Sequence, residues 1–247
     1  MLNFTMQQLN KENDPESLVK SLVSCLIVDL NLAGKNVMVI GGGTEGIRKI
    51  RGLLGQNCKI TVISNRLNRY LSNLAKQGQI EIIKTKLKDT SILDNYKNPF
   101  LVLAATDDKM LNRKIVEKGR SMGSFVYAAD DPEFSDFSYA SVINVEGMMQ
   151  VAISTYGRSP IMARKVRIKL ERMLHRIIKK SDIENTKLQE FARVAAKPKL
   201  KTVQERKQFL YSLIHNKEIQ SLITENRVEE AKTATLELLY KWEKGNK

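Results

Sequence analysis

Short apolar runs alternate with helical patterns along the first half of the chain. The β-branched run NVMVI (residues 36–40) breaks into glycines, and apolar residues then recur at helical spacing from Ile47 to Leu54. This order predicts a strand, a turn and a helix. Further strands are expected at 59–64, 80–83, 100–105 and 124–129, and further helices at 67–76 and 106–119. Strands that alternate with helices predict an α/β fold with a Rossmann-type parallel sheet.

The residues before the first strand carry a different pattern. Residues 1–20 are polar and aperiodic, so we expect a loose N-terminal extension there. The segment CLIVDLNLAGK (residues 25–35) has the pattern of a strand that ends in a turn at Ala33 and Gly34, and we expect it to pair beside the strand at 36–40. The Rossmann dinucleotide-binding domain is therefore expected to span residues 21–136.

A third pattern begins after residue 136. Two β-rich stretches, 137–145 and 149–154, are joined by a Glu-Gly pair, which predicts a hairpin outside the parallel sheet. The small β-rich segment covers residues 137–158. Ser159 and Pro160 have the residue types preferred at a helix N-cap and first position. The rest of the chain is helical in pattern, with an interruption near Pro198, and we expect a helical subdomain at 159–247.

Composition places the chain among ordinary soluble globular proteins. It has 247 residues, of which 42% are hydrophobic and 28% charged. It lacks both a long uncharged apolar run and the apolar middle of a signal peptide, so we expect a cytoplasmic protein that binds no membrane. Cys25 and Cys58 lie far apart, which argues against a disulfide framework. Histidine occurs only at 175 and 215, with no ligand partner at metal spacing, so we expect no protein-held metal ion.

The positive charge is concentrated in the last third of the chain. Residues 161–247 hold 21 Lys and Arg against 11 Asp and Glu, and the whole chain has a net charge of +14. Such a segment can bind nucleic acid or a small molecule that carries several carboxylates, or it can be a solvated helix surface. Aromatic residues make up only 6% of the chain, and no helix-turn-helix stands out, which argues against nucleic acid.

The glycines after the first strand carry the clearest chemistry. Gly41, Gly43 and Gly46 form a G-x-G-x-x-G motif between a strand and a helix, which is typical of a dinucleotide site. We expect Gly41 to allow the tight turn, Gly43 the approach of a pyrophosphate, and Gly46 the packing of helix on strand. Thr44 and Glu45 lie in the same turn, where the helix N-terminus attracts the anion.

The ends of the other strands complete this expected cofactor site. Asn65 and Arg66 follow the second strand, where the adenosine ribose should lie, and Thr106 and Asp107 follow the fourth. Ligands of such sheets bind beyond the carboxyl ends of the strands. An NAD site usually has an acidic residue after the second strand, and this chain has Ser64-Asn65-Arg66 instead. The chemistry of Arg66 alone points to NADP.

Four segments together resemble one known family. They are GGGTEGIRKIRGLL (41–54), LAATDDKMLN (103–112), AADDPEFSDF (128–137) and QVAISTYGRSPIMARKVRIKLE (150–171). In this order they resemble the siroheme synthase N-terminal module, a family of precorrin-2 dehydrogenases of which some are also sirohydrochlorin ferrochelatases. The resemblance runs from about residue 26 to the C-terminus, and the helical tail matches only loosely.

The resemblance implies an enzyme of tetrapyrrole biosynthesis. Members oxidise precorrin-2 to sirohydrochlorin with NAD, and bifunctional members then insert ferrous iron, which is a substrate. They are homodimers, which implies that the β-rich segment 137–158 serves dimerisation. Three functions stay open: dehydrogenase and chelatase, dehydrogenase with a separate chelatase, or a nucleotide-sensing regulator that binds nucleic acid. The family's use of NAD favours that cofactor here, and NADP is not excluded.

The resemblance also assigns residues. Asp130, two residues before Pro132, matches the family's catalytic aspartate, whereas the residues alone favour a role of Asp130, Asp131 and Asp136 in a proline-containing turn. Ser154 and Thr155 fall at the tetrapyrrole pocket, where at least one relative has a serine in place of the threonine. Arginine suits bidentate recognition of carboxylates, and the arginines expected to bind the carboxylate arms of the substrate are Arg158 and Arg164.

Overall fold

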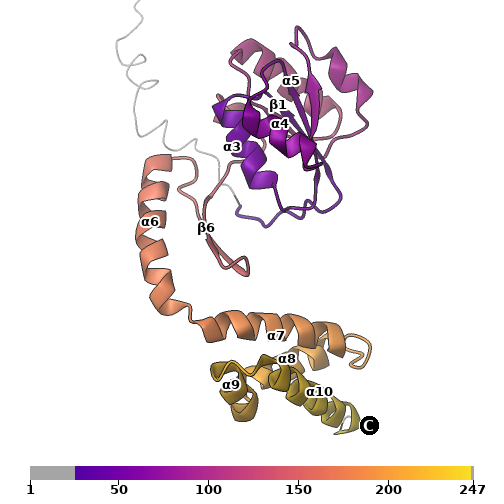
Figure 1. The fold of residues 1–247 in the computed structure, drawn as a ribbon, viewed down its shortest axis with the longest axis vertical. Helices are drawn as coiled ribbons and strands as arrows, with labels where there is room; N and C mark the ends of the chain where they lie inside the picture. Colours follow the sequence, from indigo (N-terminus) through magenta and orange to yellow (C-terminus); the bar gives the residue numbers. More distant parts are fainter. Residues whose placement is uncertain (1–25, 246–247) are drawn as a thin grey trace, which may run out of the picture. The chain divides into compact units, whose positions relative to one another are not determined.

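The computed structural model describes residues 26–245, apart from the side chain of His175, and divides into two compact units (Figure 1). Unit 1 contains the chain up to Ala140 together with the short segment Tyr156–Arg158. Unit 2 contains Ser141–Thr155 and the chain from Ser159 onward. The expected N-terminal extension, residues 1–20, lies outside the described residues.

Unit 1 is built on a parallel sheet of five strands in the order β3-β2-β1-β4-β5. The strands are β1 (Asn36–Ile40), β2 (Lys59–Ser64), β3 (Glu81–Lys84), β4 (Leu101–Ala104) and β5 (Phe125–Ala128). The helices between them are α3 (Thr44–Leu53), α4 (Arg69–Lys76), the 3-10 helix η1 (Ser91–Asn95) and α5 (Lys109–Ser121), and the 3-10 helix η2 (Pro132–Phe134) follows β5. The expected α/β fold is confirmed, and the order of strands reverses at β1 and β4, where such sheets bind ligands.

Both faces of the sheet are covered by helices, as parallel strands require. Val37 and Val39 of β1 pack on one face with Ile50 of α3 and Leu71 of α4. Met38 and Ile40 of the same strand pack on the opposite face, against residues of α5 and η1. Each of these four side chains of β1 is at most 1% exposed. The continuous apolar sequence of β1 therefore reflects burial on both sides.

The strand expected at residues 25–35 is not present among the described residues. Leu26 to Leu32 form no regular structure, and the side chains of Leu26, Ile27 and Val28 are exposed. The reason is topological, because β1 pairs with β2 along one edge and with β4 along the other. No edge of β1 remains for a further strand.

The antiparallel hairpin is confirmed, but it begins later than expected. It consists of β6 (Ser141–Val145) and β7 (Met149–Ile153), and the turn uses positive φ at both Glu146 and Gly147. The stretch before Ser141 was expected to be strand and is instead held in unit 1. There the ring of Phe137 lies 5.6 Å from that of Tyr127, and the ring of Tyr139 lies 5.2 Å from it.

The rest of unit 2 is helical, with more breaks than the one expected near Pro198. Its helices are α6 (Pro160–Ile177), α7 (Lys180–Ala196), α8 (Val203–His215), α9 (Lys217–Thr224) and α10 (Val228–Gly245). The expected cap of α6 is confirmed, because the Oγ of Ser159 accepts a hydrogen bond from the Met162 N–H at 3.2 Å. Helices α7 to α10 share a core that includes Phe209, Leu213 and Leu239, each at most 1% exposed.

Candidate functional site

Side chains do not fit at three positions of the glycine loop. Gly41 has a φ of +116°, and a Cβ there would lie 2.1 Å from the Ala105 carbonyl oxygen. A Cβ on Gly46 would lie 2.0 Å from the Gly41 carbonyl oxygen, so Gly46 is required mainly by the loop backbone and less by the strand. The sequence motif overlooked Gly42, whose Cβ would lie 2.6 Å from the Ser64 Oγ. These glycines let three strand-end loops pack together.

Gly43 and the start of α3 lie at the open side of this loop. Gly43 is the N-cap of α3 and makes no side-chain cap, and a Cβ on it would meet nothing within 4 Å. Thr44 and Glu45 are exposed in the first turn, where Glu45 pairs with Arg48 at 2.6 Å. The first N–H groups of a helix form an anion site. The expected contact of Gly43 with a pyrophosphate stays a prediction.

A pocket of about 210 Å³ lies beyond the carboxyl ends of β1, β2, β3 and β4. Of the expected cofactor residues, it is lined by Gly41, Gly43, Asn65, Arg66, Thr106 and Asp107. Three further lining residues, Thr85, Lys86 and Leu87, follow β3 and were missed by the sequence motif. The available signal was the position of Lys86, a cationic residue just after the third strand of the parallel sheet.

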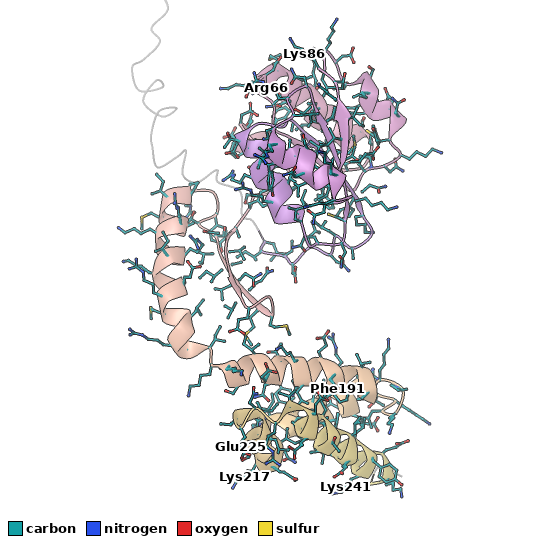
Figure 2. The ribbon with its side chains drawn as sticks, in the orientation of Figure 1. Arg66, Lys86, Phe191, Lys217, Glu225 and Lys241 are labelled. Carbon is teal, nitrogen blue, oxygen red and sulfur yellow. The ribbon has the colours of Figure 1, made fainter. Side chains whose placement is uncertain are left out.

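An ion pair crosses the mouth of this pocket. The Arg66 Nη1 lies 3.0 Å from the Asp107 Oδ2, although both side chains are largely exposed. Figure 2 shows Arg66 and Lys86 at the same end of the sheet unit. Arg66 lies where the adenosine ribose was expected, Lys86 lines the same pocket, and Asp107 neutralises Arg66. An exposed pair of this kind contributes at most about 1 kcal/mol to stability.

The three aspartates around Pro132 have different surroundings. Asp136 accepts hydrogen bonds from the Val126 N–H at 3.0 Å and from the guanidinium of Arg120 at 2.8 Å. Asp131 pairs with Arg113 at 3.1 Å. These two carboxylates therefore serve the local fold, as the turn interpretation expects.

Asp130 is exposed, and its contact is to another part of the sheet end. Its Oδ1 accepts a hydrogen bond from the Asn112 Nδ2 at 2.7 Å. Asn112 also contacts Thr106, which lines the pocket. A carboxylate that can accept a proton is thus tied to the pocket loop, and the turn interpretation does not account for it.

Lys49 forms a feature that sequence reasoning missed. It lies on α3 with only 5% of its surface exposed, and its Nζ lies 3.9 Å from the centre of the Tyr127 ring and 3.7 Å from that of Tyr139. Burial, with a smaller contribution from Arg48, lowers the pKa of Lys49 to about 8. The rings attract the charged form, so this lysine holds the segment after β5 against α3.

The expected substrate residues fall in different parts of the chain. Ser154, Thr155 and Arg164 belong to unit 2, whereas Arg158 is grouped with unit 1. The Thr155 Oγ1 accepts a hydrogen bond from the Ser159 N–H at 3.1 Å, so its hydroxyl shapes the turn before α6. Arg158 and Arg164 are exposed. The predicted contacts of these four residues with a substrate stay predictions.

Within residues 26–245, no three His, Cys, Asp or Glu side chains gather as a metal site would require. None of the helices in this range has the length and apolar character needed to cross a bilayer.

Comparisons with known proteins agree with this arrangement. Residues 28–141 match a family described as "Putative NAD(P)-binding", and residues 146–173 match one described as "Sirohaem biosynthesis protein central". The first match covers the sheet of unit 1 and the glycine loop. The second covers the end of the hairpin and most of α6.

Curated relatives match over most of the chain. A siroheme synthase of Neisseria meningitidis serogroup C is 35% identical over 180 residues, which is 72% of this chain and 35% of that protein. A siroheme synthase of Actinobacillus succinogenes is 35% identical over 214 residues, which is 86% of this chain and 42% of that protein. The chain thus spans less than half the length of these relatives.

A solved structure shares the fold. It is described as "SirC, precorrin-2 dehydrogenase", and it aligns with a TM-score of 0.64 and 21% identity over 88% of this chain and all of that one. At this identity the likeness establishes the fold. With the glycine loop and the pocket in the first matched segment and most of α6 in the second, the chain is similar in this order to an NAD(P)-binding family and to the sirohaem central family, and it is similar to the siroheme synthases named above.

Proposed function

We propose that this chain catalyses the NAD-dependent dehydrogenation of precorrin-2 to sirohydrochlorin. The observation that carries the proposal is the carboxylate of Asp130, which lies at the end of β5 and is tied through Asn112 to the loop that lines the dinucleotide pocket. The names of the relatives and of the solved structure support the substrate.

The reaction removes one hydride and one proton from the substrate. NAD bound in the pocket would supply the hydride acceptor. The pocket residues would hold the dinucleotide, and the first N–H groups of α3 would bind its pyrophosphate. Asp130 accepts the proton as general base, because an exposed carboxylate at the sheet end can meet a substrate C–H or N–H. Arg158 and Arg164 bind carboxylate arms of the tetrapyrrole through charge-assisted hydrogen bonds.

The choice between NAD and NADP depends on the ion pair at the pocket mouth. Arg66 and Lys86 could receive the 2′-phosphate of NADP, since both are cationic and line the pocket. Asp107 occupies the guanidinium of Arg66 at 3.0 Å, which lowers its availability for a phosphate and leaves a carboxylate near the ribose hydroxyls. We therefore propose NAD as the working cofactor.

A homodimer is the proposed assembly. The apolar side chains of Ile161, Met162, Val166, Met173 and Ile177 along α6 are exposed, as is Val142 of the adjoining hairpin. A contiguous apolar surface on a soluble protein marks an interaction site, and a two-stranded hairpin is marginal by itself. Light scattering on the purified chain should give twice the monomer mass. A Val166→Glu variant should shift the mass toward the monomer, whereas Lys165→Glu, next to it on α6, should not.

Iron insertion is a second activity that the same carboxylate could serve. Asp130 could accept a pyrrole N–H proton as ferrous iron enters sirohydrochlorin, which would make iron a substrate of the site. Insertion of iron into sirohydrochlorin above the rate without protein would establish this activity. A rate equal to that without protein would leave the chain a dehydrogenase with a separate chelatase.

The decisive experiment is an anaerobic assay with precorrin-2 and NAD. The expected result is the spectrum of sirohydrochlorin with one NADH per molecule formed. Absence of turnover with either NAD or NADP would refute the proposed function. Salt-sensitive binding of DNA or RNA by a chain without turnover would instead favour the regulator.

A further inference from the structure

Asn112 is a buried amide that the proposed reaction does not itself use. It lies on the first turn of α5 and is 1% exposed. Its backbone N–H donates to the Asp108 carbonyl at 2.9 Å, which fixes the start of the helix. A buried asparagine is retained where each of its polar atoms has a partner.

The orientation of this amide is determined by its neighbours. The Thr106 N–H and the Thr106 Oγ1 approach the Asn112 Oδ1 at 3.0 and 2.6 Å. A backbone N–H can only donate, so the carbonyl side of the amide must face Thr106. The Asn112 Nδ2 then donates to the Thr106 carbonyl at 3.1 Å and to the Asp130 Oδ1 at 2.7 Å.

From this geometry we propose that Asn112 is a positioning residue, which holds the carboxylate of Asp130 and couples it to the Thr106 loop of the dinucleotide pocket. The inference rests on the proposed function of Asp130. The charged residues next to Asp130 are Asp131, its neighbour in the chain, and Arg113 on α5. These two pair with each other at 3.1 Å. The hydrogen bond from Asn112 is thus the contact that orients this carboxylate toward the loop.

The test uses Asn112→Asp, which keeps the size of the side chain and the acceptor side that faces Thr106. It loses the donor to the Asp130 carboxylate and to the Thr106 carbonyl, and it brings a second carboxylate to that position. NAD affinity, measured by titration calorimetry, should stay within about threefold of the wild type, while turnover at pH 9 falls at least about tenfold, because general-base catalysis requires the placed base. The matched control is Asn73→Asp on the exposed surface of α4, which should change neither.

The pH profile separates positioning from a loss of folding. Two adjacent carboxylates share one proton until the pH rises. In Asn112→Asp a protonated residue 112 can still donate to Asp130, so turnover relative to wild type should be highest near pH 6 and fall steadily toward pH 9. A relative turnover that is equal at both pH values, or an unchanged turnover at pH 9, would overturn the proposal.

Exchanging the two side chains supplies a readout besides activity. The double variant Asn112→Asp with Asp130→Asn restores a donor and an acceptor in contact, so it should recover the thermal stability lost by Asn112→Asp while remaining inactive. A double variant that is no more stable than Asn112→Asp contradicts a direct contact. If the wild-type chain itself does not oxidise precorrin-2, the proposed function fails, and the exchange still decides whether Asn112 holds Asp130.

Discussion

The Nζ of Lys49 lies 3.9 Å from the centre of the Tyr127 ring, in a position where the lysine is 5% exposed. The contact joins α3 to β5, and Tyr139 closes it from the segment that leads toward the hairpin. An ammonium group against two aromatic rings is attracted by about 0.5 to 2 kcal/mol per ring. Desolvation of the ammonium group opposes this attraction. The net contribution of Lys49 to stability therefore depends on its charge, and hence on pH.

Stability should rise with pH through Lys49. Its pKa is lowered from 10.5 to about 8 by burial, so above pH 8 the folded chain has released a proton that the unfolded chain still binds. Stability then increases with pH. Relative to Lys49→Met, the wild type should gain up to about 2 kcal/mol between pH 7.5 and 9.5, measured by urea denaturation.

The control for this prediction is Lys35→Met. Lys35 is exposed and its Nζ lies 5.3 Å from the Phe100 ring, so the same substitution removes a cation above an aromatic ring without a buried site. The difference between wild type and Lys35→Met should not change over this pH range. Parallel pH dependences of wild type and Lys49→Met would contradict the role of burial.

Asp130→Asn should abolish most of the turnover while nucleotide binding persists. The amide cannot accept the proton, and positioned general bases contribute about 100-fold or more. Steady-state anaerobic kinetics with precorrin-2 and calorimetric titration with NAD check both parts. Asp131→Asn is the matched control, because it removes only the pair with Arg113 and should reduce turnover by less than about threefold. Equal losses in the two variants would contradict the assignment.

Gly46→Ala should prevent dinucleotide binding and destabilise the fold. Its Cβ would lie 2.0 Å from the Gly41 carbonyl oxygen, and overpacking of this kind costs about 1 to 3 kcal/mol. Gly52→Ala on the same helix is the control, since a Cβ there meets nothing within 4 Å. That variant should be more stable by about 0.5 to 1 kcal/mol. Thermal unfolding followed by circular dichroism measures both changes.

Asp107→Ala should shift the cofactor preference toward NADP. It releases the guanidinium of Arg66 from an ion pair of 3.0 Å, and a free guanidinium binds phosphate through charge-assisted hydrogen bonds. The ratio of the dissociation constants for NAD and NADP should move toward NADP by about tenfold at low salt. Arg66→Asp should move it the other way. A ratio unaffected by either variant would mean that the 2′ position lies elsewhere.

Periodicity was sufficient to predict the five strands of the parallel sheet and the helices α3, α4 and α5 to within a few residues, but it did not predict the 3-10 helices η1 and η2. Burial on both faces requires an unbroken apolar run such as Leu101–Ala104. The Oδ1 of Asp108 caps α5 by accepting from the Leu111 N–H at 3.0 Å, so this helix begins at Lys109 and not at residue 106 as expected. Such signals are local, so they are present in the sequence itself. The glycine motif is local too, although the reason for Gly46 lay in the loop backbone.

Pairing and packing required the tertiary structure. Residues 26–32 have the composition of a strand, yet β1 has no free edge, and edge occupancy depends on segments distant in sequence. Two contacts likewise join segments that no periodic pattern connects. They are the contact of Lys49 with the Tyr127 ring and the hydrogen bond from Asn112 to Asp130.

The sequence by itself therefore determined the class of fold, the dinucleotide loop and the identity of Asp130 as a candidate base. The tertiary structure decided which aspartate is held toward the pocket loop and which two serve the turn. The physical reason is that secondary-structure propensity and the periodic pattern of buried residues depend on neighbours in the chain. Hydrogen bonds and cation–π contacts of buried groups depend on which distant segments the packed sheet brings together.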